Sequence, residues 1–465
     1  MRRILLFLFV GLAFAGRVLA AQATVTDRRI EEKKRRSADA APSHTLLRSP
    51  PFWVQAGGQV NYRYIYYRNI DKDSSLKDYY SAYRSTDLRL WSRLVYQTSE
   101  MRQSKQMHFL YARFKSAYIE QEGTAPGLKY DLAGPAVDYA YGSFDWRPWK
   151  LEAGRKYFSV GRGFAYGAVN DGASLDYSWQ QVKLGVLAAR SLPHQANIDT
   201  SVPGYDKASQ RYFYGSVLGY SGVPDQNFYA FWLAEQDHSR ERPADPEQDY
   251  RYQARFSGLG ARGDLGQKWS YWSEVVRENG RSYAYPSSEG SAVSAWGADS
   301  GVEYAVGTLK ELKLSAEYGF GSGDGERRSV TNTVSGNASG NDRGFRYFGY
   351  LPTGAALAPA LANLHMARAG FSFYPFITSE RFKGLELAAD HYRYWKAEPA
   401  GGIDDPEALG SGRNVGYEND LRLDWHVNAR LAWSLEWGVF TPGNSYSAPA
   451  DDRETVFNAS MTLVF

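Results

Sequence analysis

The stretch Phe457-Asn-Ala-Ser-Met-Thr-Leu-Val-Phe465 decides the fold of this chain. Its alternate residues are apolar: Phe457, Ala459, Met461, Leu463 and Phe465. The residues between them include Asn458, Ser460 and Thr462. Successive side chains of a β-strand point to opposite faces. The pattern therefore predicts a strand with one apolar and one polar face that ends in an aromatic residue.

The two ends of the chain indicate the same destination. An apolar, alternating terminal strand with a final aromatic residue resembles the insertion signal of bacterial outer-membrane β-barrels. Residues 1–23 have the form of a signal peptide, with a cationic start at Arg2 and Arg3, an apolar core over 4–14 and small residues at 18–23. We therefore predict export and a location in the bacterial outer membrane.

The composition is typical of a membrane barrel. After the leader, no apolar run reaches the ~18 residues of a transmembrane helix, and a closed barrel is the other structure that satisfies its backbone in lipid. The chain contains 0 cysteines, which excludes disulfides and thiolate metal sites. The formal net charge is +3, and the leader carries three arginines and no acid, so the remainder is near neutral. This balance argues against a nucleic-acid partner.

We divide the chain into three parts. Residues 1–23 are the signal peptide, residues 24–50 form a flexible, charged periplasmic segment, and residues 51–465 form the outer-membrane β-barrel domain. Strand-like runs in the last part alternate with short turns and with long loops such as 191–210. They predict an all-β fold, a single transmembrane antiparallel β-barrel of about 18 strands (roughly 16–18), with short periplasmic turns and long extracellular loops. A barrel of that size leaves an aqueous channel.

Charged side chains are expected to face this channel. A charge on the lipid face costs about 2–4 kcal/mol near the bilayer midplane, so a strand that alternates charged and apolar residues turns its charges inward. Arginines and lysines around a pore favour anionic groups, and many will also pair with acids on neighbouring strands. This rule places the following residues in the lumen: Arg63, Arg89, Arg93, Arg113, Lys115, Arg155, Arg251, Arg255, Glu274, Glu317, Arg368, Glu386, Asp390 and Arg422.

Short motifs resemble the alginate-export porin family. Residues 151–163, LEAGRKYFSVGRG, followed by residues 170–176, NDGASLD, are similar to the family's "GRQ…G…D" segment. Residues 416–424, GYENDLRLD, and 440–443, FTPG, are similar to its closing region. The resemblance spans most of residues 55–465. It implies a barrel of about 18 strands that exports a negatively charged exopolysaccharide.

The resemblance also assigns residues. Six positions carry over as lumen or constriction residues: Arg155, Arg162, Asp171, Asp176, Glu418 and Asp420. Glycines at 154, 161 and 163 fit a bulged or inward-folded backbone, which would bring Arg155 and Arg162 into the pore. The complete predicted substrate-binding and pore-lining set is Arg63, Arg89, Arg93, Arg113, Arg155, Arg162, Asp171, Asp176, Arg368, Glu418, Asp420 and Arg422.

Two features depart from the family pattern. Lys156 stands where the family usually has Gln, and the late turn at residues 428–429 is very short, which leaves little periplasmic material to form a gate there. Both departures bear on alginate as the substrate more than on export.

The expected mechanism is passive transport. The glycine-rich run 319–325 lacks the lysine and Ser/Thr of a phosphate-binding loop, and we interpret it as an outer-loop hinge. No cofactor, metal site or catalytic residue is predicted, because the seven histidines are scattered and the acid pairs at 404–405 and 451–452 lie in loops. The chain is therefore not expected to be an enzyme. Loop 321–364 fits a lid over the outer mouth and a mobile surface loop equally well.

One alternative shares the fold. An outer-membrane porin for small solutes, such as organic acids or sugars, would have the same barrel and charged lumen, and only the family motifs favour export. The expected partners are outer-membrane lipid and either an acidic polysaccharide or a small anionic solute. The family resemblance further implies periplasmic and inner-membrane export components.

Overall fold

Strand pairing dominates the structure. The computed structural model describes residues 44–76, 78, 81–122, 128–192, 210–238, 252–284, 287–307, 311–327, 337 and 339–465. The predicted signal peptide, residues 24–43 and Arg251 lie outside these ranges. The strands are β1 His44–Ser49, β2 Phe52–Arg68, β3 Ala82–Tyr96, β4 His108–Glu122, β5 Leu128–Trp146, β6 Trp149–Val160, β7 Tyr166–Trp179, β8 Val182–Arg190, β9 Arg211–Tyr220, β10 Gln226–Asp237, β11 Tyr252–Leu265, β12 Trp269–Ala284, β13 Ser287–Ala305, β14 Lys313–Gly321, β15 Leu364–Phe373, β16 Leu385–Lys396, β17 Asn414–His426, β18 Leu431–Pro442 and β19 Glu454–Val464.

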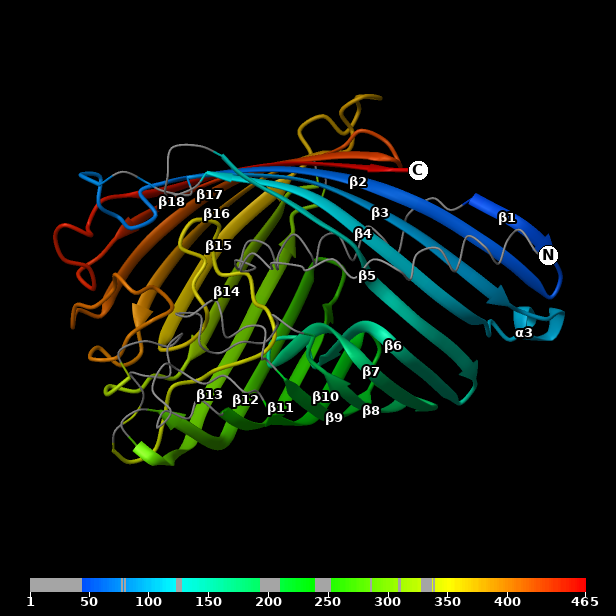
Figure 1. The fold of residues 1–465 in the computed structure, drawn as a ribbon, viewed down its shortest axis with the longest axis horizontal. Coiled ribbons are helices and arrows are strands. Elements are labelled where there is room, and N and C mark those ends of the chain that lie inside the picture. The colour runs from blue at the N-terminus through cyan, green and yellow to red at the C-terminus, as the bar shows by residue number, and fades with distance from the viewer. Residues whose placement is uncertain are drawn as a thin grey trace.

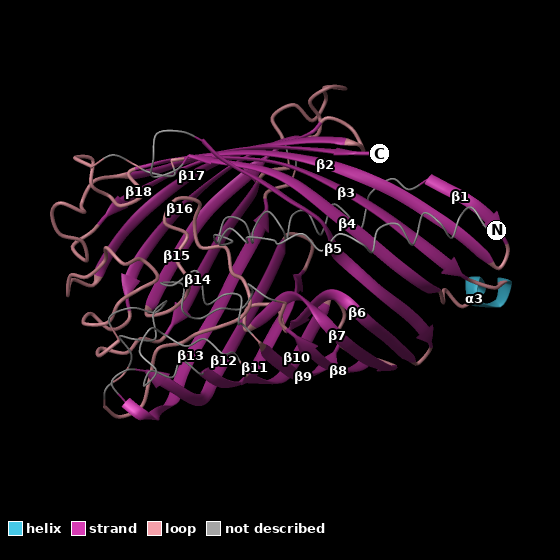
Figure 2. Ribbon diagram, viewed as in Figure 1, coloured by secondary structure: helices cyan, strands magenta, loops and turns pink. Residues whose placement is uncertain are grey.

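Strands β2 to β19 form a closed barrel. Each pairs antiparallel with the next, and β19 returns to β2 in a register that runs from Thr455 opposite Arg68 to Val464 opposite Gln59. The barrel therefore has 18 strands, and the ribbon in Figures 1 and 2 curves round into one wall made almost entirely of strands. Among the described residues, no helix is long and apolar enough to cross a membrane.

The terminal stretch closes the seam as its sequence predicts. The Phe465 amide donates to the Gly58 carbonyl at 2.9 Å, and the Gly58 amide donates back at 2.8 Å. The Phe465 ring lies over Gly58, where an added Cβ would come within 2.5 Å of it. A side chain at position 58 would therefore displace the final aromatic residue from the seam.

The alternation of faces follows the sequence. On β3, Leu88, Leu90 and Leu94 are exposed on the outer surface, whereas Asp87 and Arg89 are buried on the lumen side. An apolar outer surface is what a strand in contact with lipid requires. We call the end with the long connections the outer end and the opposite end, which holds Phe52 and Phe465, the inner end.

Several element boundaries differ from the predictions. Residues 97–100 leave the barrel wall and lead into a short helix, α3 (Ser99–Gln103), capped by the Thr98 hydroxyl, which accepts from the Met101 amide at 3.2 Å. Gly319 and Gly321 belong to β14, so the predicted hinge over 319–325 is wrong in its first half. Residues 44–49, expected in the flexible segment, form β1, which pairs with β2 beyond the last residue that β19 reaches.

Candidate functional site

Three neighbouring strands carry a basic surface into the lumen. Arg63 on β2, Arg89 and Arg93 on β3, and Arg113 and Lys115 on β4 all lie on the lumen face, and we call them the basic wall. Arg93 pairs with Gln55 and Arg89 with Gln59 in the strand register. The wall therefore extends along β2 from Gln55 to Arg63, a separation of eight residues that corresponds to about 26 Å along the strand.

The most buried members of this wall are held by acids. Arg89 is 0% exposed, and its Nε donates to Asp87 Oδ1 at 2.9 Å. Its Nη1 lies 3.4 Å from Asp138 Oδ2, which also accepts from Arg113 Nε at 2.7 Å. The Arg113 guanidinium lies 4.3 Å from the centre of the Tyr139 ring. These bonds hold the two buried guanidinium groups in place and offset part of their positive charge.

A β-bulge supplies the shared acid. The register of β4 with β5 shifts between Arg113 and Phe114, which face Tyr139 and Val137, so Asp138 is the extra residue. A bulge redirects a side chain that simple alternation would send to the other face. Sequence alternation therefore missed Asp138.

The opposite side of the barrel is acidic. In a closed ring of 18 strands, β12 lies nine strands from β3 and faces it across the lumen. Glu274 and Glu278 on β12, Asp299 on β13 and Glu317 on β14 are buried on the lumen face, and we call them the acidic wall. Arginines pair with two of these acids, Arg162 with Asp299 and Arg368 with Glu317.

The tip of the β6–β7 hairpin folds inward and reaches the acidic wall. The backbone amide of Arg162 donates to Glu274 Oε2 at 2.8 Å. The Arg162 guanidinium pairs with Asp299 and lies 4.8 Å from the centre of the Trp272 ring. Gly161 has a φ of 54°, and a Cβ there would lie 2.2 Å from the Glu274 carboxylate. Only glycine fits that close approach, so residues 161–165, the hairpin tip, depend on it.

Arg155 and Asp171 pair with each other on this hairpin. Arg155 Nε and Asp171 Oδ1 are 2.8 Å apart, and Arg155 Nη1 donates to the Val137 carbonyl at 2.9 Å. The register places them on the same face as Leu151 and Leu175 and opposite Lys156, which pairs with the lumen-facing Glu152, so alternation does not place Arg155 and Asp171 on the lumen face as predicted. Asp171 is 50% exposed, so this pair is open to solvent.

A second segment crosses the lumen. Residues 339–363, the crossing segment, follow β14 and are bound to the hairpin tip by two backbone hydrogen bonds. The Phe348 amide donates to the Ala165 carbonyl at 2.9 Å and the Tyr350 amide to the Gly163 carbonyl at 3.0 Å. The Phe345 ring packs against the Phe164 ring in a tilted arrangement, with 5.4 Å between their centres. In Figure 1 this yellow segment runs across the interior of the barrel.

Glu418 anchors the far end of the crossing segment. Its carboxylate is buried on β17 and accepts from the amides of three consecutive residues, Ala355, Ala356 at 2.6 Å and Leu357 at 3.0 Å. Tyr394 donates to it from β16 at 3.2 Å. The resemblance assigned Glu418 to the lumen or constriction, and in the structure it binds the segment that crosses the lumen.

A buried ion pair fixes the near end. Arg327 and Asp342 are paired, and Asp342 Oδ2 also accepts from the Ser282 hydroxyl at 2.9 Å. Burial alone would raise the pKa of Asp342, but the charge and hydrogen bond of Arg327 outweigh it and hold that pKa below its ordinary value of 3.8. The two anchors lie four to five strands apart around the barrel, the near one on β12–β13 and the far one on β17.

The remaining predicted residues occur in local ion pairs. Arg368 bridges Glu317 at 2.7 Å and Asp390 at 2.8 Å. Arg422 pairs with Asp424 at 2.9 Å, next to Asp420 on the same face of β17. On the other side of the barrel, Asp176 pairs with Lys183 at 3.1 Å.

The outer loops are tied by another buried charge. Lys72 Nζ lies 2.8 Å from Asp405 and 3.0 Å from Glu454, and Tyr446 also donates to Asp405 at 2.8 Å. Burial alone would lower the pKa of Lys72, but these two carboxylates outweigh it and raise that pKa above 10.5. Asp405, one of the acids considered for a metal, is thus occupied by protein groups.

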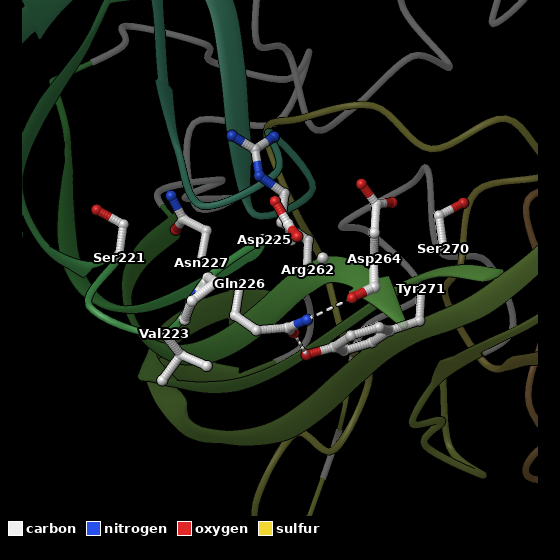
Figure 3. A pocket seen from close by; sticks show the side chains of 11 residues that line it. Ser221, Val223, Asp225, Gln226, Asn227, Arg262, Asp264, Ser270 and Tyr271 are labelled. Atoms are coloured by element: carbon white, nitrogen blue, oxygen red, sulfur yellow. Dashed lines mark hydrogen bonds between the residues drawn. The ribbon is translucent and has the colours of Figure 1, made fainter. Parts of the chain in front are cut away.

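A hollow of about 530 Å³ lies at the inner end, away from these charges. Figure 3 shows the turn residues around it, where Gln226 donates to the Asp264 carbonyl at 2.6 Å and accepts from Tyr271 at 2.5 Å. None of the predicted site residues lines it. It is a gap between turns at the rim.

The lumen prediction for Arg255 is wrong. Arg255 is exposed and shares a face of β11 with Leu259, whereas Tyr252, Ala254 and Phe256 are buried on the lumen side. Arg255 is the fourth residue of its strand at the outer end. The cost of a charge on the outer surface falls to about 0–1 kcal/mol near the membrane interface, so the midplane rule does not apply there.

Comparisons with known proteins agree with the architecture. A family model described as "Alginate export" matches residues 52–459. Solved structures of outer-membrane porins from Pseudomonas aeruginosa share the fold: OccK5 (OpdH) and OccK8 (OprE), each with 12% identity, a TM-score of 0.53, and coverage of 89% of this chain and 98% of the other. OccK11 (OpdR) has 12% identity, a TM-score of 0.54, and coverage of 89% and 96%. A search of curated protein sequences found no match.

Proposed function

Because this chain belongs to the alginate export family and forms an outer-membrane channel barrel, we propose that it is a passive channel that exports an anionic exopolysaccharide. Family and fold are those of channels rather than of enzymes. The observation that supports the proposal best is the basic wall, because five cationic side chains extend along one side of the lumen. Their positive field would attract successive acidic units of a polymer.

The contacts of the wall suit movement rather than capture. Arg89 and Arg113 already share Asp138, so an incoming carboxylate gains only part of their charge. Arg93 and Lys115 are only partly buried and are the members best placed to contact the polymer. Conduction requires many weak sites rather than one strong site.

The crossing segment would act as the gate of this channel. It is bound to the hairpin tip and to Glu418, and a polymer would pass only after these contacts open. The position of the crossing segment in the lumen also supports the second candidate, a porin for small organic acids or sugars. A small solute can pass through a narrower channel than a polymer can. Periplasmic and inner-membrane export components remain predictions from the family.

Single-channel conductance in planar bilayers tests the proposal. Oligouronates added to the wild-type protein should block the current, and neutral oligosaccharides of equal length should not. The double variant Arg93→Gln/Lys115→Gln should need roughly 30-fold more oligouronate for half block, since the two charges contribute about 1 kcal/mol each in water. Arg84→Gln is the control, because Arg84 lies on the outer face of β3 and pairs with Glu120.

Two outcomes would overturn export of an acidic polymer. Equal block by neutral and acidic oligosaccharides would show that charge does not select the solute. Current that small organic acids block and oligouronates leave unchanged would favour the small-solute porin.

A further inference from the structure

Three arginines lie together on the outer surface of β11 and β12. On β11, Gln253, Arg255, Ser257 and Leu259 are exposed and alternate with buried lumen residues. On β12, Arg277 and Arg281 lie on the face opposite the buried Glu274 and Glu278. We call Arg255, Arg277 and Arg281 the outer arginine triad, and it is separate from the lumen charges that the channel uses.

The strand register brings the triad together. Arg255 faces Asn279, so Arg277 and Arg281 are its two diagonal neighbours on β12. Such diagonal positions are about 7–8 Å apart, within the combined reach of two long side chains. The three guanidinium groups can therefore converge on one ligand.

The triad lies at the level where a lipid headgroup would sit. One row of the sheet runs from Trp232 through Ser257 and Arg277 to Trp296, and the two tryptophans are 45% and 47% exposed. Relative to this row, Arg255 lies one outward-facing row nearer the outer end and Arg281 lies two rows nearer. The next row toward the membrane centre holds Leu259 and Val275. Aromatic side chains mark the boundary between hydrocarbon and headgroups in barrels.

Among the described residues of the strands that flank the triad, no acid lies on the same surface. The outward residues of the neighbouring strands are Phe228, Ala230, Trp232, Ala234 and Gln236 on β10, and Ala292, Ser294, Trp296 and Ala298 on β13. Within the described ranges, neither Arg255 nor Arg281 forms an ion pair. Arg277 is held in place by its hydrogen bond to the Ser294 hydroxyl at 2.6 Å and by Trp296, 4.7 Å from its guanidinium.

We propose that the outer arginine triad binds the phosphate groups of a phosphorylated lipid headgroup in the outer leaflet. Guanidinium groups match phosphate oxygens in two-point contacts, and a headgroup with two phosphates would engage more than one arginine. Gln253 and Asn279 add exposed amide groups beside them. The lipid chains would lie over Leu259 and Val275. This site does not depend on what the channel transports.

The test compares lipids that differ only in phosphate. The folded full-length barrel is placed in phosphatidylcholine nanodiscs that contain a few lipid A molecules, and retained lipid is counted by native mass spectrometry. Diphosphorylated lipid A should be retained by the wild type, and fully dephosphorylated lipid A should not. Arg255→Gln/Arg281→Gln should bind the diphosphorylated form roughly 10- to 30-fold more weakly, from about 1 kcal/mol for each basic side chain near an anionic lipid surface.

The matched control is Arg84→Gln, an outward arginine of β3 that already pairs with Glu120. It should change retention less than twofold, and the melting temperature of each variant shows that the barrel is intact. Equal retention of both lipid forms, or equal loss in the control, would overturn the site. If adding millimolar pyrophosphate displaces the bound lipid A, the triad binds free phosphate groups as well as it binds the lipid. That result would overturn a lipid site.

Discussion

The basic wall and the crossing segment use similar polar groups but hold them differently. Arg89 is bound by Asp87, two residues away on the same strand, and by Asp138 two strands away in the same wall. Glu418 instead binds amides more than sixty residues away in sequence. The wall is therefore built by strand pairing itself, whereas the crossing segment is held by hydrogen bonds to distant strands and by buried side chains such as Phe345 and Leu361. We therefore expect the crossing segment, whose contacts are tertiary, to be the part that moves when the proposed gate opens.

Removing a charge from the wall should have the largest effect. Arg89→Ala leaves the buried Asp87 and the partly buried Asp138 carboxylates undercompensated, which should destabilise the barrel by about 3–5 kcal/mol. Urea unfolding in lipid vesicles measures this change. Arg84→Ala removes an exposed ion pair and should cost roughly 0–1 kcal/mol. Equal losses in the two variants would show that the wall gains nothing from its internal pairing.

Releasing the crossing segment should affect the current more than stability. Glu418→Gln replaces hydrogen bonds to a charged acceptor and should weaken the closed arrangement by about 3 kcal/mol, a roughly 100-fold rise in the open population. Single-channel open probability measures it. Asp424→Asn, on the same face of the same strand, is the control and should leave gating unchanged. An unchanged open probability in Glu418→Gln would rule out this anchor.

The hairpin tip gives a smaller, local test. Gly161→Ala combines a positive φ with a Cβ that meets the Glu274 carboxylate, and should cost about 1–3 kcal/mol. Gly266→Ala has a φ of 71° and open space around it, so it measures the backbone cost alone, about 1 kcal/mol. The difference between the two unfolding free energies isolates the contact with the acidic wall. No difference would mean that the tip moves aside freely.

Acid should weaken the near anchor. Folding lowers the pKa of Asp342 through Arg327, so the pair contributes its full stability above the ordinary value of 3.8 and loses it as the pH falls through the lower folded value. Open probability should therefore rise severalfold below that pH. Asp342→Asn should show a higher open probability at neutral pH and a weaker dependence on acid. A wild-type channel that closes further in acid would contradict this anchor.

Much of the site was predictable because it lies on strands. Arg89, Arg113 and Glu274 alternate with apolar residues, and the alternation places them on the lumen face as observed. Asp138 and Arg255 show where alternation fails. A bulge turns Asp138 toward Arg113, and the interface level makes an outward Arg255 tolerable. Both depend on where along the strand a residue lies relative to its neighbours and to the membrane.

The sequence by itself determined the barrel, a strand number of about 18 and the face of most strand residues, because strand-like runs can be counted between turns and the faces follow from a period of two and from the cost of charge in lipid. It also indicated the inward backbone at Gly161 and Gly163 through glycine spacing. Only the tertiary structure decided that the hairpin tip meets the crossing segment and that Glu418 binds its amides. Those contacts join residues that are far apart in the sequence, and no periodic pattern relates them. They form only after the barrel has closed and has brought these residues together.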